Sequence, residues 1–420
     1  MKIIFLHPDL GIGGAERLVV DAAVALQNKG HVVRLLTFHH DSAHCFPETR
    51  DGTLEVTCKG DWLPRSIFDR CNALLAYIRM IYLAFHFVIN ACHYVGNDAI
   101  DSEVVVFVDQ ISACIPVIRL LTNYRCLFYC HFPDQLLTKR ESLLKKLYRT
   151  PIDWVEERTT GLAHTILVNS NFTASVFKTT FKSLRDKKIT VLYPSINDEL
   201  NFDASDRKSS AELDIPTTAK YVLVSINRYE RKKNIALAVQ SLALLEPKLS
   251  VKQWNTTHLI IAGGYDVNVP ENVQHYGELK ALVSNLNLED HVTFLRSIST
   301  ATKQALLMRA TALLYTPSNE HFGIVPLEAM LYARPVVAVN LGGPLETIDH
   351  DKTGFLVPPD SNSFATAIQI LIENDALREE MGRSGQLRVR EMFSFQQFSL
   401  RLDEIITNVT GMDKCGIKTG

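Results

Sequence analysis

The feature that most constrains the fold is an alternation of apolar strand and amphipathic helix that begins at the N-terminus and starts again halfway along the chain. The apolar run Lys2–His7 leads into the turn Gly11-Ile-Gly-Gly14, a helical pattern over Ala15–Asn28 and a second apolar run His31–Phe38. Strand, glycine turn, helix and strand in this order predict a βαβ unit with a parallel sheet. The same rhythm returns from the apolar run Tyr221–Ile226 onward. We therefore predict an α/β protein made of two Rossmann-like, doubly wound domains.

The length of the chain agrees with two domains, since 420 residues are enough for two separate cores. A polar stretch bounded by Pro194 and Pro216 is rich in Asn, Asp and Ser, and it is the candidate linker between them. We predict an N-terminal domain over 1–200 and a C-terminal domain over 201–395. Residues 396–420 are predicted to form a C-terminal helix and tail, for which a return to the N-terminal domain is one option.

Composition excludes some classes of protein. A formal net charge of −2 argues against bulk binding of nucleic acid. The eight cysteines are scattered and include no C-x-x-C pair, so the sequence indicates neither a zinc site nor a disulfide framework. We expect reduced thiols in a protein that faces the cytosol.

Two groups of candidate ligand-binding residues lie in the first half. Gly13 and Gly14 allow a ligand to approach the backbone closely at the start of a helix, where an anion is favoured. The spacing is not G-x-G-x-x-G, so a phosphate or diphosphate contact and a purely structural turn both remain open. His131 follows the apolar run Arg125–Cys130, at the edge where parallel sheets bind ligands. It could donate to a sugar hydroxyl, accept a proton, or only cap the strand.

In the second half, the predicted strand Tyr221–Ile226 runs into Asn227-Arg-Tyr-Glu-Arg-Lys-Lys-Asn234, with four cations in six residues before a helix. Charge runs are usually solvated, but this position favours a phosphate-binding role for Arg228 and Lys233, because Arg can fork two phosphate oxygens and Lys adds a point charge. Gly263 and Gly264 end the next predicted strand and again permit close approach of the backbone.

The stretch Glu320-His-Phe-Gly-Ile-Val-Pro-Leu-Glu328 combines two carboxylates eight residues apart with Pro326, which suits the first turn of a helix. Next to Phe322, a cluster of exposed amides would form an anion site. This arrangement suits a nucleotide-sugar, although a solvated loop acid before an ordinary helix fits the stretch alone equally well. The exposed amides next to Phe322 are those of Gly323, Ile324 and Val325.

Two doubly wound domains would place their strand ends facing across a cleft, with a donor on the second domain and an acceptor on the first. No D-x-D motif sits at a strand end with apolar flanks, so the sequence gives no reason to assign a divalent metal or another cofactor. The cations Arg228 and Lys233 could neutralise a departing diphosphate instead.

The stretch 72–97 is the most apolar in the chain, and its polar residues Asn72, Arg79, His86 and His93 recur every seven positions. On a helix they would form one narrow polar stripe. Such a helix could lie in a membrane interface, sit half-buried in the protein, or span a bilayer.

Together these motifs resemble those of the retaining glycosyltransferases of family 4, which have the GT-B fold. The resemblance covers roughly residues 1–408. It implies that Glu320 contacts the transferred sugar, Glu328 the ribose, Arg228 and Lys233 the diphosphate, and that His131 lies near the reacting sugar. It rests on Gly13–Arg17, His131–Pro133, Val168–Thr173, Arg228 with Lys233, Gly263-Gly264, Pro317–Met330 and Gly342–Glu346.

Within that family, the motifs are similar to those of the eukaryotic enzymes that add α-1,3 and α-1,6 mannoses to dolichol-linked oligosaccharide. The similarity implies GDP-mannose as donor, Man1-2GlcNAc2-diphosphodolichol as acceptor, and the cytosolic face of the endoplasmic reticulum membrane, with other mannosyltransferases of the pathway as candidate partners. The polar tail Met412–Gly420 departs from the apolar sequence expected there, so more of any membrane contact is assigned to 73–95.

Three alternatives remain beside this interpretation. A GT-B transferase could use another nucleotide-sugar and a different soluble or lipid acceptor. A nicotinamide-dependent oxidoreductase would need a glycine spacing that Gly11–Gly14 lacks and would leave the acids of the second domain idle. A non-catalytic membrane scaffold would have no use for the complete set of polar groups.

Overall fold

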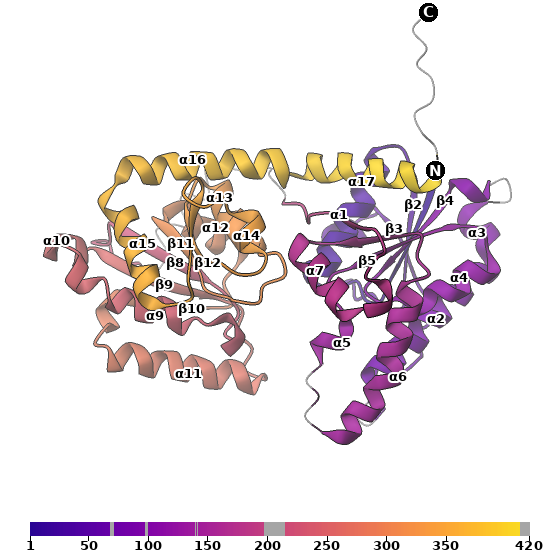
Figure 1. Cartoon of the computed structure of the whole chain (residues 1–420), viewed down its shortest axis with the longest axis horizontal. Helices are drawn as coiled ribbons and strands as arrows, with labels where there is room; N and C mark the ends of the chain where they lie inside the picture. The colour runs from indigo at the N-terminus through magenta and orange to yellow at the C-terminus, as the bar shows by residue number, and fades with distance from the viewer. Residues whose placement is uncertain (68–70, 97–99, 139, 141, 197–214, 412–420) are drawn as a thin grey trace, which may run out of the picture. The chain divides into compact units, whose positions relative to one another are not determined.

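A computed structural model describes residues 1–67, 71–96, 100–138, 140, 142–196 and 215–411, which form two compact units (Figure 1). The first unit is Met1–Ser195 together with Phe395–Gly420, and the second is Ile196–Ser394. The chain therefore changes unit after Ser195 and again after Ser394, where the sequence analysis placed boundaries at 200 and 395. Most of the predicted linker, 197–214, and the tail 412–420 lie outside the described residues.

The first unit is built on a seven-stranded parallel sheet in the order β3-β2-β1-β4-β5-β6-β7. Its strands are β1 (Lys2–His7), β2 (Val32–Thr37), β3 (Glu55–Cys58), β4 (Val104–Asp109), β5 (Arg125–Cys130), β6 (Thr165–Val168) and β7 (Ile189–Val191). Its helices are α1 (Gly14–Asn28), α2 (Asn72–Ile89), α3 (Ala91–Val95), α4 (Ile115–Leu121), α5 (Asp134–Leu137), α6 (Leu143–Thr160), α7 (Asn171–Thr180) and α17 (Phe395–Thr410).

Alternation along the central strand β1 divides the core of this unit into two layers. Ile3 and Phe5 pack with α1 and α17 on one face of the sheet. Ile4 and Leu6 pack with α2, α4 and α7 on the other face. Because successive side chains of a strand point to opposite faces, a strand covered on both sides reads as the continuous apolar run seen in the sequence.

The last helix, α17, belongs to the first unit, although the second unit precedes it in sequence. Phe398, Leu402 and Ile406 recur at helical spacing and are buried in the same core as the apolar face of α1. His31, which follows α1, lies 3.1 Å from the Asp403 carboxylate. The helix therefore completes one face of the first sheet.

The second unit repeats the plan with a six-stranded parallel sheet in the order β10-β9-β8-β11-β12-β13. Its strands are β8 (Tyr221–Ile226), β9 (Thr257–Gly263), β10 (Val292–Arg296), β11 (Ala312–Tyr315), β12 (Val336–Val339) and β13 (Gly354–Val357). Its helices are α9 (Ala236–Ala243), α10 (Val251–Trp254), α11 (Pro270–Asn285), α12 (Thr300–Arg309), α13 (Ile324–Leu331), α14 (Pro344–Thr347), α15 (Ser361–Glu373) and α16 (Asp375–Met392).

Two strands, β3 and β13, are not predicted from the sequence; they lie at the edges of the two sheets. Each contains only four residues. Such a run is too short to show a period, and β3 also contains the polar residues Glu55 and Thr57. Their existence depends on pairing with β2 and β12, which the local sequence does not reveal.

Within the apolar stretch, residues 72–95 form two helices, so the prediction of one continuous stripe is wrong for His93, which lies on α3 after a break at Asn90. Asn97 lies outside the described residues. Of the remaining stripe, Asn72 is exposed, His86 is half-buried and Arg79 faces the protein. Arg79 is only 3% exposed, its guanidinium lies 3.8 Å from the centre of the Phe38 ring, and its Nη2 lies 3.2 Å from Asp61. The arginine is tolerated inside because it is paired.

The exposed face of α2 is apolar as a consequence. Leu74, Ile78, Phe85 and Ile89 are 42–78% exposed and lie on one side of the helix. Among the described residues, α2 is the one helix long and apolar enough to cross a membrane by length and composition, and 39% of its 18-residue window is buried in the protein.

Candidate active site

In the second unit, the predicted phosphate-binding cations lie on the loop between β8 and α9. The ring of Tyr229 is fully buried, and its hydroxyl donates to the Ile261 carbonyl at 3.0 Å, which fixes the middle of the loop. The side chain of Arg228 is 64% exposed, and its guanidinium lies 3.3 Å from the Glu230 carboxylate. The buried Tyr229 thus fixes the loop, and the guanidinium of Arg228 remains available for an anionic ligand.

Gly263 and Gly264 lie beside this loop, at the carboxyl end of β9. Gly263 has φ +144°, and a Cβ there would overlap the backbone carbonyl of Asn227. A Cβ on Gly264 would lie 3.2 Å from Cγ of Arg228. The two glycines therefore let the ends of β8 and β9 approach each other and leave room for the stem of Arg228.

Lys233 and Glu320, both predicted to bind the donor, form an ion pair. The Nζ–Oε2 distance is 2.6 Å, and the side chains are 16% and 23% exposed. Burial alone would raise the pKa of Glu320, but the Lys233 ammonium and hydrogen bonds from Lys233 and Tyr315 hold this pKa below its ordinary value. The pair supplies a fixed carboxylate and a cation at one point of the sheet edge.

Glu328 is held in a similar way by a lysine that the sequence analysis did not single out. Nζ of Lys303, on α12, lies 2.6 Å from Oε1 of Glu328. The other oxygen, Oε2, is buried and has no hydrogen-bond partner among the described residues. A buried carboxylate oxygen without a donor is costly, so this atom is suited to accept a hydrogen bond from a ligand hydroxyl.

The helix start between the two acids has the predicted form. Gly323 caps α13 with φ +85°, and the Gly343 amide donates to the Glu320 carbonyl at 2.8 Å. The predicted amides of Ile324 and Val325 open the helix. The ring of Phe322 is 5% exposed and packs edge-on against Phe393, so this residue can offer a ligand its backbone rather than its ring.

In the first unit, the predicted glycine turn leads directly into α1. A Cβ on Gly13 would meet the Glu16 carboxylate, whereas a Cβ on Gly14 would meet nothing within 4 Å. Neither residue has a positive φ that would require glycine. Open space beside Gly14 and the first turn of a long helix are compatible with close approach of an anion.

His131 lies at the end of β5 and takes part in a buried network that the sequence did not indicate. Its Nε2 lies 2.9 Å from Oδ1 of Asp109, and Nδ1 of His7 lies 2.9 Å from Oδ2 of the same carboxylate. Asp109 is fully buried, whereas the side chain of His131 is 22% exposed. Asp109 therefore orients the ring of His131, and part of the His131 side chain remains accessible to a ligand.

The segment after His131 is anchored by Glu156 of α6, which accepts hydrogen bonds from the Asp134 and Gln135 amides at 2.7 and 3.1 Å. Burial and the nearby Asp134 carboxylate raise the pKa of Glu156 from 4.5 to about 8. Between these values the folded protein holds a proton that the unfolded chain has released, so folding stability falls as the pH rises through this window.

We therefore expect the free energy of unfolding to decrease from pH 5 to pH 8, with Glu156 contributing at most about 1.4 kcal/mol per pH unit. Glu156→Gln should flatten this slope, because glutamine cannot ionise. Urea unfolding at a series of pH values measures the effect. Glu157→Gln, on the next residue of α6, is the control and should keep the wild-type slope.

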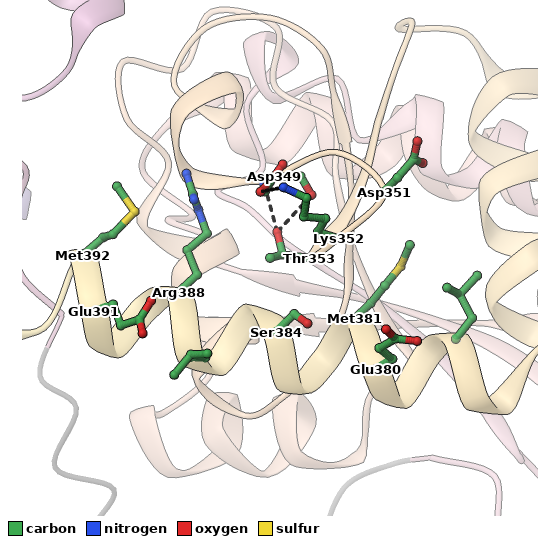
Figure 2. A pocket seen from close by; sticks show the side chains of 12 residues that line it. Asp349, Asp351, Lys352, Thr353, Glu380, Met381, Ser384, Arg388, Glu391 and Met392 are labelled. Carbon is green, nitrogen blue, oxygen red and sulfur yellow. Dashed lines mark hydrogen bonds and ion pairs between the residues drawn. The ribbon is translucent and has the colours of Figure 1, made fainter.

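Two pockets lie apart from the predicted site residues. One, of about 460 Å³, is lined by α16 and the turn before β13; Asp349 lies beside Lys352 and Thr353, across from Arg388 (Figure 2). The other, of about 700 Å³, lies beside the starts of α2 and α6. In the part of the chain that the structure describes, no group of three or more His, Cys, Asp or Glu side chains could hold a metal ion.

Lys303, Asp109 and His7 were not predicted as site residues. Each contacts a side chain that lies far away in the sequence; His7 and Asp109, for example, are separated by 102 positions. Asp109 and His7 end buried strands, and that position is the one signal that could have drawn attention to them. Lys303 stands on an ordinary amphipathic helix and carries no signal.

Two protein-family models match the chain, one for each half. The model described as Glycosyltransferase Family 4 matches residues 12–200. The model described as Glycosyl transferases group 1 matches residues 206–388. Together the two matches span most of the chain.

Similar curated proteins match along almost the whole length. The Alpha-1,3/1,6-mannosyltransferase ALG2 of Homo sapiens is 52% identical over 411 residues, covering 97% of this chain and 96% of that protein. The protein of the same name from Saccharomyces cerevisiae is 39% identical, covering 98% of this chain and 86% of that protein.

Solved structures share the fold at low sequence identity. A sucrose-phosphate synthase from Thermosynechococcus elongatus superimposes with a TM-score of 0.72 at 21% identity, covering 98% of this chain and all of that chain. Anabaena HepE, solved in complex with UDP and glucose, superimposes with a TM-score of 0.69 at 20% identity, covering 97% of this chain and all of that chain. The predicted GT-B fold class, with two parallel α/β domains, is confirmed.

Proposed function

Because the chain belongs to the family 4 glycosyltransferases and, within them, to the α-1,3/1,6-mannosyltransferases, we propose that it transfers mannose from GDP-mannose to Man1-2GlcNAc2-diphosphodolichol. The site observation that carries this proposal is the pairing of Lys233 with Glu320 at 2.6 Å, beside the exposed Arg228. A cation pair for a diphosphate and a fixed acid for the sugar are the groups that transfer from a nucleotide-sugar requires.

Each side chain then has a separate task. Arg228 and Lys233 neutralise the diphosphate, in place of a divalent metal. Glu320 binds the mannose that is moved. Glu328 accepts a hydrogen bond from a ribose hydroxyl through Oε2, the buried oxygen that lacks a partner among the described residues. Gly263, Gly264 and the amides near Gly323 allow the donor to lie close to the protein backbone.

The proposed chemistry proceeds on one face of the sugar, with retention of configuration. The bond from the anomeric carbon to the β-phosphate oxygen breaks while the acceptor hydroxyl oxygen bonds to that carbon. The proton of the hydroxyl passes to the departing diphosphate, so GDP leaves and no protein nucleophile is needed. Lys233 stabilises the negative charge as it develops on the phosphate.

The test of this function uses the purified full chain, a panel of nucleotide-sugars and a polyprenyl-diphosphate chitobiose carrying one mannose. We expect turnover with GDP-mannose and products containing both α-1,3 and α-1,6 linkages, identified by NMR. Transfer from a UDP-sugar, or to a soluble acceptor in preference to the lipid-linked one, would favour the alternative transferase.

A lipid-linked acceptor requires the enzyme to work at a membrane, and we assign this contact to the exposed apolar face of α2. We place the protein on the cytosolic face of the endoplasmic reticulum, with other mannosyltransferases of the pathway as candidate partners. The inward-facing Arg79 and outward-facing Ile78 and Phe85 suit a helix lying in the interface with its apolar side toward lipid.

The double variant Ile78→Lys/Phe85→Lys should reduce association with phosphatidylcholine–phosphatidylinositol vesicles about tenfold, because charged groups replace apolar area at the lipid boundary. Vesicle co-sedimentation measures the effect. Val273→Lys changes a residue that is 43% exposed on α11 of the second unit and should bind vesicles as the wild type does. Equal binding by all three proteins would contradict the assignment to α2.

A further inference from the structure

The network behind His131 occupies the carboxyl ends of three neighbouring strands. His7 ends β1, Asp109 ends β4, and His131 follows the last residue of β5, in a sheet where these strands are adjacent. Each oxygen of the Asp109 carboxylate lies 2.9 Å from one imidazole nitrogen. On its far side, Nε2 of His7 is 3.8 Å from Oε1 of Glu16, whose carboxylate lies against Gly13. The four side chains form a row from the glycine turn to His131.

The geometry determines which nitrogen of His131 carries a hydrogen. An ionised carboxylate only accepts hydrogen bonds, so Nε2 of His131 and Nδ1 of His7 both donate to Asp109. In neutral His131 the other nitrogen, Nδ1, is then an acceptor. Two further contacts hold the ring and its backbone: the Tyr129 ring at a centroid distance of 4.7 Å, and the Asn169 amide, which donates to the His131 carbonyl at 3.1 Å.

In this row His7 lies between the carboxylates of Glu16 and Asp109. Burial alone would lower the pKa of His7, but the hydrogen bond with Asp109 and the nearby Glu16 carboxylate raise it to about 9. Burial would raise the pKa of Asp109, and the two histidines hold it below its ordinary value. His7 is therefore a cation at neutral pH and compensates the carboxylate on which His131 rests.

We propose that Asp109 is a positioning residue for the transfer reaction: it accepts from Nε2 of His131 and so keeps the neutral ring in the tautomer with hydrogen on Nε2, while His7 holds the other oxygen of the same carboxylate. His131 thus presents Nδ1 as an acceptor for a hydroxyl of the bound sugar or acceptor. This inference rests on the proposed function and on the family resemblance, which implies that His131 lies near the reacting sugar.

A buried ion network is by itself weak evidence for a stabilising role, because the cost of desolvation offsets much of the attraction. Here the row has one partly exposed end, His131, and its other members are oriented toward that residue. The titratable groups that face the row from the surrounding elements are Glu16 on α1 and Tyr129 and Cys130 on β5.

Two substitutions test this role. Asp109→Asn removes the obligatory acceptor, so neutral His131 should show both tautomers. His7→Gln keeps the Asp109 carboxylate, so neutral His131 should keep its hydrogen on Nε2. A general loosening of the unit would not separate the two variants in this way. Histidine ¹⁵N chemical shifts in the labelled full chain, assigned with His131→Gln, measure both effects without turnover.

The kinetic readout is kcat, which should fall about 10- to 100-fold in Asp109→Asn, as is typical when an orienting partner is removed, with little change in KM for GDP-mannose. The control is His31→Gln, which breaks a His–Asp pair of 3.1 Å in the same unit, between α1 and α17. It should leave kcat and the ¹⁵N shifts of His131 unchanged. If Asp109→Asn fails to fold, His7→Gln/Asp109→Asn removes both charges together and should show the mixed tautomers.

The proposal is overturned if the ¹⁵N shifts of His131 are the same in wild type and Asp109→Asn. It is also overturned if His31→Gln reproduces the effects of Asp109→Asn, since the cause would then be general loosening of the unit. Wild-type protein that is inactive with GDP-mannose but shows the predicted shifts would contradict the proposed function and leave the tautomer assignment supported.

Discussion

Replacement of Glu320 by glutamine is expected to lower kcat for mannosyl transfer by about 10³-fold, comparable to the loss of a single preorganised group that stabilises charge in a transition state. The substitution keeps the shape of the side chain but removes the charge that pairs with Lys233 at 2.6 Å. Steady-state kinetics with GDP-mannose measure the effect, and circular dichroism with thermal unfolding checks the fold.

Glu328→Gln is the matched comparison, because it makes the same chemical change on a carboxylate that is also 2.6 Å from a lysine. If Glu328 binds the ribose, this variant should raise KM for the donor about tenfold, the equivalent of roughly 1.4 kcal/mol, while kcat changes little. Near-normal kcat in Glu320→Gln, or the same kinetic pattern in both variants, would contradict the separate roles assigned to the two acids.

A second large effect is expected from Gly263→Ala. The residue has φ +144°, and the added Cβ would overlap the backbone carbonyl of Asn227, which cannot move without displacing the loop that carries Arg228. We expect a loss of about 2–4 kcal/mol in the free energy of unfolding, together with loss of donor binding, because backbone strain and a backbone clash add. Urea unfolding and titration with GDP measure the two quantities.

Gly277→Ala provides the control for this substitution. Gly277 lies inside α11 of the same unit, and a Cβ there would meet nothing within 4 Å. Alanine should therefore stabilise the helix by about 0.5–1 kcal/mol and leave donor binding unchanged. If Gly263→Ala behaves like Gly277→Ala, the close approach of β8 and β9 is not required.

Much of the fold could be predicted from local sequence because parallel strands covered on both faces are continuous apolar runs with polar residues directly after them. His131 follows such a run directly, Arg228 follows one after Asn227, and Gly263 ends one. The exceptions depend on tertiary context: β3 and β13 exist by pairing with a neighbour, and the direction of the α2 stripe is set by Asp61 and Phe38, which receive the Arg79 side chain.

The candidate site divides in the same way. Glu320 and Glu328 stand out because they flank a glycine turn and a helix start within nine residues of chain. Their lysine partners do not stand out equally. Lys233 belongs to a conspicuous run of cations, whereas Lys303 pairs with Glu328 across 25 positions. A pattern can indicate which residues are suited to a ligand, but it does not indicate which side chains hold them in place.

The position of α17 has a consequence for synthesis of the protein. The buried side chains of Phe398, Leu402 and Ile406 complete the core beneath one face of the first sheet, and Ser195 lies 200 positions before Phe395. At about 5–20 residues per second, a ribosome needs roughly 10–40 seconds to traverse that interval. Throughout that time the nascent first unit exposes an apolar surface that only the end of the chain can cover. The second unit, which is continuous in sequence, can complete its fold earlier, so the part made first is finished last.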